Sequence, residues 1–254
     1  MPAERQSRYK ALRLLALASI AQSVMTLPVF AQAAPPPPAA PIEEGSFALQ
    51  VTHDRLLNAL NEPQNWLTSN GNLESWRFSR LEQINRDNVK DLQMVWAMSL
   101  GGANDVVGPN GPNIQGNPLV DNGVMYAGAE WGRVFKIDVT NPHKGDLIWI
   151  ADPLMEHEGN QSISRGIALF GEYVYNALHD GRVIAIHRDT GEIVWDKEIA
   201  VQTEFGGRER FVSQPLAVKG KILVSNGAGD AGTRGWLAAL DAKTGEELWR
   251  WYAV

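Results

Sequence analysis

The stretch Ala239–Trp249 reads ALDAKTGEELW, and Ala185–Trp195 reads AIHRDTGEIVW. In both stretches an apolar run leads into a turn that contains Thr-Gly, and a second short run ends in tryptophan. Lys136–Trp149 (KIDVTNPHKGDLIW) follows the same pattern with a longer turn, and a fainter copy ends at Trp96. The chain therefore repeats itself, and a tryptophan marks the end of each repeat.

The tryptophans at 96, 149, 195 and 249 recur roughly every 50 residues, and short apolar runs fill the intervals. Such a period is typical of a β-propeller or a similar array, in which each blade is a small antiparallel sheet. Alternating apolar residues and Gly-centred turns predict four strands in each of three repeats. The expected strands are 118–120, 124–127, 133–138 and 147–149; 166–169, 173–177, 182–187 and 193–195; 215–218, 222–225, 236–241 and 247–249.

We therefore expect an all-β fold, a partial β-propeller over residues 46–254. A lead-in segment (46–96) precedes blade repeats that end near residues 149, 195 and 249. Helical patterns are expected around 53–60 and 85–92. Each repeated tryptophan is expected to close the outer strand of its blade and to pack against the next blade, because indole buries a large area and its N–H can reach a carbonyl.

Residues 1–33 have the pattern of a secretory signal peptide. Basic residues precede an apolar run over 14–30, and Ala31–Ala33 fits a small-x-small cleavage site. An uncleaved membrane anchor is the alternative, although the run is short for a membrane span and contains a Gln and a Pro. We expect cleavage and export to the periplasm, with association with the inner membrane left open. Residues 34–45, rich in Pro and Ala, are expected to form an extended linker.

The composition excludes several classes of function. The 254 residues contain no Cys, which excludes disulfides, thiolate zinc sites and a cysteine nucleophile. The formal net charge is −6, so no nucleic-acid partner is expected, since nucleic acid requires a positive face. No dinucleotide-binding fingerprint and no Gly-x-Ser-x-Gly nucleophile motif is present in the sequence.

The phrase Ala-x-Asp-x-x-Thr-Gly-x-x-x-Trp, which ends here at Trp249, resembles the blade signature of quinoprotein dehydrogenases. The lead-in segment, from Asn65-Trp66-Leu67-Thr68 to Gln83-Ile84-Asn85, is similar to the start of methanol- and ethanol-type alcohol dehydrogenases that use pyrroloquinoline quinone (PQQ). The resemblance covers about residues 51–254. It implies an eight-bladed propeller, of which this sequence holds about three to four blades, and therefore an incomplete ring.

The resemblance implies the N-terminal portion of an exported enzyme that oxidises an alcohol to an aldehyde by hydride transfer to PQQ, assisted by Ca²⁺ or a lanthanide ion. Electrons would then pass to a cytochrome c or a membrane quinone. The resemblance leaves open whether the protein forms a homo-oligomer. The catalytic Asp is expected beyond residue 254, so the 254-residue chain alone is expected to be inactive. The alternative is a non-enzymatic PQQ-like propeller, either a binding scaffold or an inactive truncated paralogue.

Two PQQ contacts are implied by position in the family's pattern. Arg165 lies in Ser164–Gly166, which matches the family's Asn-Arg-Gly, and the planar fork of an arginine pairs well with carboxylate oxygens. Gln115 lies in Gln115–Leu119, where the family usually has a Glu. The amide of Gln115 can still form hydrogen bonds, but it adds no negative charge.

The glycine-rich stretch Asn226–Gly235 resembles a family loop whose backbone contacts PQQ and whose acidic residue binds the metal. It implies cofactor contacts at Ala228 and Gly229 and a metal ligand at Asp230, where most relatives have Glu. A carboxylate is chemically suitable there, because hard cations prefer oxygen ligands.

Two further positions depart from the family's pattern. The family's Thr near PQQ falls on Val212 in strict register, which leaves Ser213 as the nearest hydroxyl and the expected contact. Gly159-Asn160 stands where many relatives have two adjacent cysteines, and the chain has none.

Overall fold

The computed structural model describes residues 50–101, 113–156, 163–200, 209–227, 229 and 232–253. All of them belong to one compact unit, Pro38–Val254. The predicted signal peptide and linker lie outside the described residues, so those boundaries stay predictions. Among the described residues, no helix has the length and apolar character that crossing a membrane requires.

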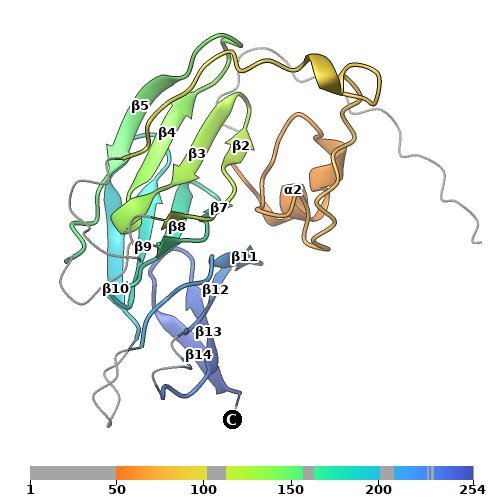
Figure 1. The fold of residues 1–254 in the computed structure, drawn as a ribbon. Helices are drawn as coiled ribbons and strands as arrows, with labels where there is room; N and C mark the ends of the chain where they lie inside the picture. Colours follow the sequence, from red (N-terminus) through yellow and green to blue (C-terminus); the bar gives the residue numbers. More distant parts are fainter. Residues whose placement is uncertain are drawn as a thin grey trace, which may run out of the picture. The chain divides into compact units, whose positions relative to one another are not determined.

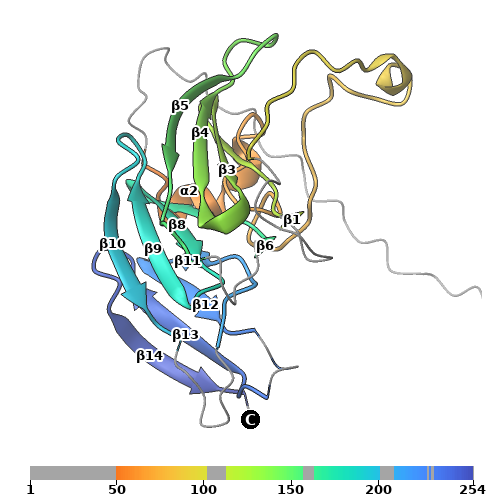
Figure 2. The same cartoon turned by 60° about the vertical axis from the view of Figure 1, so that its left-hand side comes forward.

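Three four-stranded antiparallel sheets form the fold, each with its strands in chain order (Figures 1 and 2). The first sheet contains β2 (Leu119–Asp121), β3 (Val124–Gly128), β4 (Val134–Asp138) and β5 (Asp146–Ala151). The second contains β7 (Ala168–Phe170), β8 (Tyr173–Ala177), β9 (Arg182–His187) and β10 (Ile193–Glu198). The third contains β11 (Leu216–Val218), β12 (Lys221–Ser225), β13 (Trp236–Asp241) and β14 (Glu247–Tyr252).

These strands confirm the all-β prediction and fall in the expected order. The main difference is at the outer strands, which continue past the tryptophan that was expected to end them. Each tryptophan keeps the same place in its sheet, because Trp149, Trp195 and Trp249 pair with Lys136, Ala185 and Ala239 and each lies beside a register shift. The repeat in the sequence is therefore a repeat of strand register as well.

The repeated tryptophans join neighbouring sheets through the glycine of the next turn. A Cβ added at Gly191 would lie 2.9 Å from the ring of Trp149, and one added at Gly245 would lie 2.8 Å from the ring of Trp195. The indole N–H groups donate to backbone carbonyls of the same turns, Trp149 to Arg188 at 3.1 Å and Trp195 to Ala242 at 3.2 Å. Both glycines have positive φ, so the Thr-Gly turn supplies the backbone conformation and also the space for the ring.

The packing prediction is confirmed in full for Trp149 and Trp195, and Trp96 shares the contact with a glycine but lies in no strand. Trp96 lies over Gly145 of the first sheet, with ring atoms 3.1 Å from a Cβ placed there. Trp249 has the same register as the others, yet 42% of its surface is exposed, whereas Trp195 is 9% exposed. Trp249 differs because no described sheet follows β14 to offer it a glycine turn.

The lead-in segment begins with a short helix, α2 (His53–Leu57), followed by the 3₁₀ helix η1 (Ala59–Asn61). Thr52 caps α2, because its hydroxyl oxygen accepts a hydrogen bond from the N–H of Arg55. The second expected helical stretch forms only the 3₁₀ helix η2 (Val89–Asp91).

Two bridges attach this segment to the inner strands of the first two sheets. Trp66 exchanges backbone hydrogen bonds with Val120 at 2.8 and 2.9 Å, and the carbonyl of Val51 accepts from the N–H of Gly171 at 2.8 Å. Leu56 and Leu67 are then buried in the same core as the three sheets. These contacts fix the lead-in segment to β2 of the first sheet and to the turn after β7 of the second sheet.

Candidate functional site

A short parallel pair lies immediately before the inner strands of the first two sheets. It consists of β1 (Asn113–Ile114) and β6 (Ile163–Ser164), in the register Asn113 to Ile163 and Ile114 to Ser164. Figure 2 shows the two strands side by side. This pair was not expected from the sequence, because two-residue strands have no detectable periodicity.

Gln115 and Arg165 meet at the end of this pair. The Nε of Arg165 donates to the Oε1 of Gln115 at 3.0 Å, and the backbone N–H of Gln115 donates to the carbonyl of Ser164 at 2.8 Å. Both side chains are exposed. Among the hydrogen bonds of the described residues, the Nη groups of Arg165 have no acceptor, so they are available to an anion.

Two glycines allow the segments that carry Gln115 and Arg165 to come this close. A Cβ at Gly116 would lie 2.5 Å from the backbone nitrogen of Gly166, which is closer than real Cβ contacts come. Gly166 itself has φ +127°, a conformation that side chains disfavour. The backbones at Gly116 and Gly166 are in contact, which leaves no room for a side chain at Gly116.

Two residues that the sequence reasoning did not select, Ser69 and Gln214, lie against Gly166, and a third, Ser164, precedes Gly166 by two positions. A Cβ added there would lie 2.9 Å from the Oε1 of Gln214 and 3.2 Å from the Oγ of Ser69. The hydroxyls of Ser69 and Ser164 are buried without a hydrogen-bond partner among the described residues. Ser69 and Gln214 also line a cavity of about 20 Å³, enough for one water molecule. The sequence offered one clue to these residues, since Ser164 is next to Arg165 and Gln214 is next to Ser213.

Ser213, the predicted contact from the third repeat, has an exposed side chain, whereas its neighbour Gln214 is partly buried. The contacts of the described residues do not join Ser213 to Gln115 or Arg165. It stays a prediction.

The glycine-rich loop is described only in part. The N–H of Gly227 donates to the carbonyl of Arg210 at 2.8 Å, and the hydroxyl of Thr233 donates to the carbonyl of Gly227 at 3.0 Å, so both ends of the loop are attached. Gly229 is exposed with no atom near its Cβ position. Ala228 and Asp230 lie outside the described residues. The roles predicted for these three residues stay predictions.

The described residues include no group of three His, Asp or Glu side chains that could hold a metal ion. Asp230, as well as Gly159 and Asn160, lies outside them. The metal site is therefore a prediction carried by the sequence alone.

The residues present suit a flat, anionic and oxygen-rich ligand. Arg165 offers two Nη groups that are free among the described contacts, Gln115 offers an amide, and Gly116 and Gly166 leave the adjoining backbone without side chains. The buried hydroxyls of Ser69 and Ser164 lack partners behind this surface. A PQQ molecule, with its carboxylates and quinone oxygens, fits such donors.

Comparison with known protein families shows which family this chain belongs to. The family described as glucose/ethanol/alcohol dehydrogenase, beta-propeller domain, whose short name is PQQ, matches residues 66–254. This chain belongs to that family. The match covers all three sheets and the lead-in segment from Trp66 onward, so the sheets are blades of a PQQ-type propeller.

Relatives of the PQQ family are similar over most of this chain. The quinohemoprotein alcohol dehydrogenase of Comamonas testosteroni is 34% identical over 205 residues, which cover 78% of this chain and 27% of the relative. The dehydrogenase subunit of a quinone alcohol dehydrogenase of Gluconacetobacter polyoxogenes is 32% identical over 214 residues, 80% of this chain and 27% of the relative. The chain thus spans about a quarter of the length of these relatives.

Solved structures in this PQQ group have the same fold. A europium-containing methanol dehydrogenase is 30% identical with a TM-score of 0.67, covering 78% of this chain and 34% of the neighbour. The Comamonas testosteroni quinohemoprotein alcohol dehydrogenase is 32% identical with a TM-score of 0.67, covering 80% of this chain and 29% of the neighbour.

Proposed function

We propose that this chain is the N-terminal portion of an exported PQQ-dependent alcohol dehydrogenase that oxidises an alcohol to an aldehyde. The observation that carries the proposal is the pairing of Arg165 with Gln115 across two neighbouring blades of a PQQ-type propeller. A scaffold without a cofactor has no need for an arginine that is oriented by a neighbour and leaves its Nη groups open.

Each residue of this surface has a distinct part in holding the cofactor. Arg165 would bind a carboxylate or quinone oxygen through its Nη groups, while Gln115 fixes its Nε and so orients the guanidinium plane. Gly116 and Gly166 keep the backbone open to a flat ring system. Bound PQQ would supply the oxidising quinone that accepts hydride from the alcohol carbon.

The remaining parts of the proposal rest on the sequence pattern and the family. Asp230 would contribute a carboxylate to a Ca²⁺ or lanthanide ion that polarises the cofactor. The europium in the similar methanol dehydrogenase supports a metal in this class of site. A cytochrome c or a membrane quinone would take the electrons, in keeping with the quinohemoprotein and quinone names of the relatives.

Equilibrium binding of PQQ to this chain tests the proposal without requiring activity. We expect PQQ to quench the tryptophan fluorescence of the chain, and Arg165→Met to weaken binding at least tenfold. Arg86→Met is the matched control, because Arg86 is an exposed arginine of the lead-in segment that makes no contact with Gln115 or Arg165 among the described hydrogen bonds. Failure of PQQ to bind, or equal losses in both variants, would favour the non-enzymatic propeller.

A further inference from the structure

A polar cavity of about 250 Å³ lies beside the turns that follow β2 and β7. Its lining includes Asn122, after β2, and Glu172, after β7. Gln115 and Arg165 precede the same two strands, so the cavity is at the opposite end of these strands from the candidate cofactor residues. The cavity is therefore separate from the site described above.

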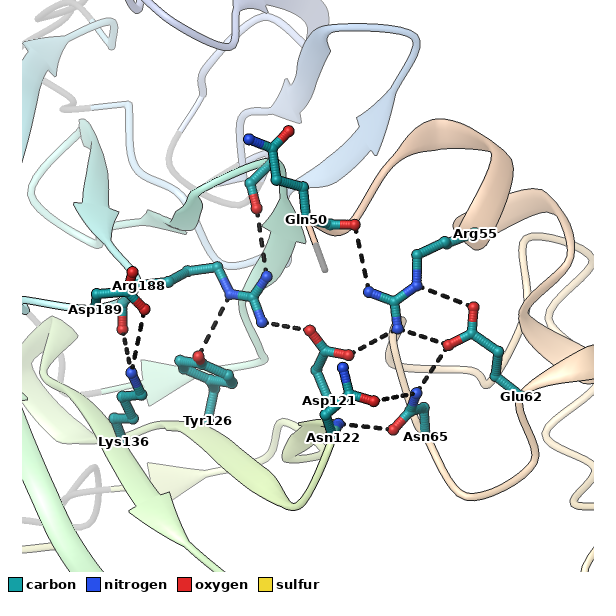
Figure 3. Close-up of polar contacts among 11 residues, drawn as sticks. Gln50, Arg55, Glu62, Asn65, Asp121, Asn122, Tyr126, Lys136, Arg188 and Asp189 are labelled. Carbon is teal, nitrogen blue, oxygen red and sulfur yellow. Dashed lines mark hydrogen bonds and ion pairs between the residues drawn. The ribbon is translucent and has the colours of Figure 1, made fainter. Parts of the chain in front are cut away.

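The deepest charges beside the cavity compensate one another. Asp121, whose side chain is 2% exposed, receives a hydrogen bond from Arg55 on one carboxylate oxygen and from Arg188 on the other (Figure 3). Arg55 also contacts Glu62 at 2.6 Å. These two arginines and two carboxylates form a buried network with balanced charge, which leaves little net field in the cavity.

Lys136 adds a positive charge to this balanced network. Its side chain is 10% exposed and lines the cavity, and its ammonium donates to the carbonyl of Arg188 at 2.7 Å. The carboxylate beside it, Asp189, is 3.7 Å away and 81% exposed, so water weakens this ion pair but does not remove it. Burial lowers the pKa of the Lys136 amine, as expected for a cation that is only partly compensated.

Two neutral donors on the same lining have spare capacity. The hydroxyl oxygen of Tyr126 accepts from the Nε of Arg188 at 3.4 Å, and among the described contacts its own proton has no acceptor. The amide oxygen of Asn122 accepts from Asn65, and its NH₂ group likewise has no acceptor among those contacts. Both side chains line the cavity, so it offers more donors than acceptors at depth.

Apart from Asp121, which the two arginines compensate, the negative groups that line the cavity are at its rim. Glu172 is exposed and accepts from the amide of Gln50 at 3.3 Å, and Asp189 is exposed as well. Charges in contact with water interact weakly over several ångströms. The depth of the groups, and not their total number, therefore sets the preference of the cavity.

We propose that this cavity binds a small carboxylate anion, held by the ammonium of Lys136 and by hydrogen bonds from Tyr126 and Asn122. A carboxylate is an acceptor-only group with two oxygens, which matches one buried cation and two spare donors. The volume suits a molecule of a few carbon atoms, since cavities for larger organic ligands begin at about 300 Å³. The site is independent of the cofactor and of the activity proposed above.

Isothermal titration of the chain with acetate, and with acetamide as its neutral isostere, tests the proposal. We expect acetate to bind and acetamide to bind at least tenfold more weakly. Lys136→Met should reduce acetate affinity at least tenfold, whereas Lys144→Met, at an exposed lysine in the β4–β5 turn, should retain it. Equal binding of the two ligands, full binding by Lys136→Met, or no acetate binding at all would overturn the proposal.

A second variant keeps the test decisive if Lys136→Met does not fold. Asp189→Asn removes the exposed carboxylate that competes for the ammonium of Lys136 and leaves every buried group in place. It should tighten acetate binding several-fold. Unchanged or weaker acetate binding by this variant would contradict the proposed role of Lys136.

Discussion

The ring of Trp195, on the outer strand of the second sheet, covers Gly245 in the last turn of the third sheet. A Cβ at Gly245 would lie 2.8 Å from that ring, and the indole N–H donates to the carbonyl of Ala242 in the same turn. The same relationship joins Trp149 to Gly191. Neighbouring blades are therefore held by a repeated contact between one tryptophan and one glycine.

Gly245→Ala should lower the free energy of unfolding by more than the strain of a left-handed backbone conformation alone would. Gly220 has nearly the same φ (+73° against +71°) but no atom within 4 Å of its Cβ position. Gly220→Ala should cost about 1 kcal/mol for the left-handed conformation. Gly245→Ala should cost about 1–3 kcal/mol more, because the new methyl group clashes with Trp195. Urea unfolding of the two variants measures the difference, and equal losses would contradict the packing role.

Trp195→Phe should destabilise the chain far more than Trp249→Phe. The first substitution removes a buried hydrogen bond and leaves a gap between two blades, for a loss of about 2 kcal/mol. The second changes a side chain that is 42% exposed, and its effect should stay within about 0.5 kcal/mol. Thermal and urea unfolding of both variants would show this contrast, and comparable losses would argue against it.

Asp121→Asn should be strongly destabilising. The substitution leaves Arg55 and Arg188 facing a neutral amide in a buried site, and such unpaired buried charges cost about 3–5 kcal/mol. Asp146→Asn is the control, because Asp146 pairs with Lys144 at 2.7 Å on the surface, where both side chains are more than half exposed. The control should have little effect. A small loss for Asp121→Asn would mean that water already reaches the network.

Acid should weaken the third sheet through Asp241. The backbone N–H of Thr244 and that of Lys243, each at 2.9 Å, hold the pKa of the Asp241 carboxyl below its usual value near 3.8. A carboxyl with a lowered pKa in the folded state stabilises the protein above about pH 4, and this stability is lost as the pH falls through the lowered pKa.

Asp241→Asn tests this pH dependence. The amide keeps an acceptor oxygen for the turn but cannot titrate, so the loss of stability with acid should be shallower in the variant. Urea midpoints measured between pH 7 and pH 2 give the comparison. Identical slopes in the two proteins would show that Asp241 contributes nothing to the acid sensitivity.

Local patterns were sufficient to predict the strands of the three four-stranded sheets, although not the short pair β1 and β6. All twelve expected strands form, because each depends on alternation within about five residues and on turns such as the Thr-Gly turn at Gly245. The resemblance of short motifs also selected Arg165 and Gln115, which the structure brings within hydrogen-bond distance. The packing of Trp249 against a further blade stays a prediction, since the pattern describes the tryptophan but not the turn that receives it.

Sequence alone determined the repeat, the strand order and the identity of the family, because these depend on short patterns that recur along the chain. Tertiary structure decided which distant residues meet. Ser69 and Gln214 both lie against Gly166, and Asp121 joins Arg55 to Arg188, a set that spans more than a hundred residues. Such contacts arise only when blades and lead-in segment pack together, since burial makes the partners of each polar group obligatory and no local pattern specifies them.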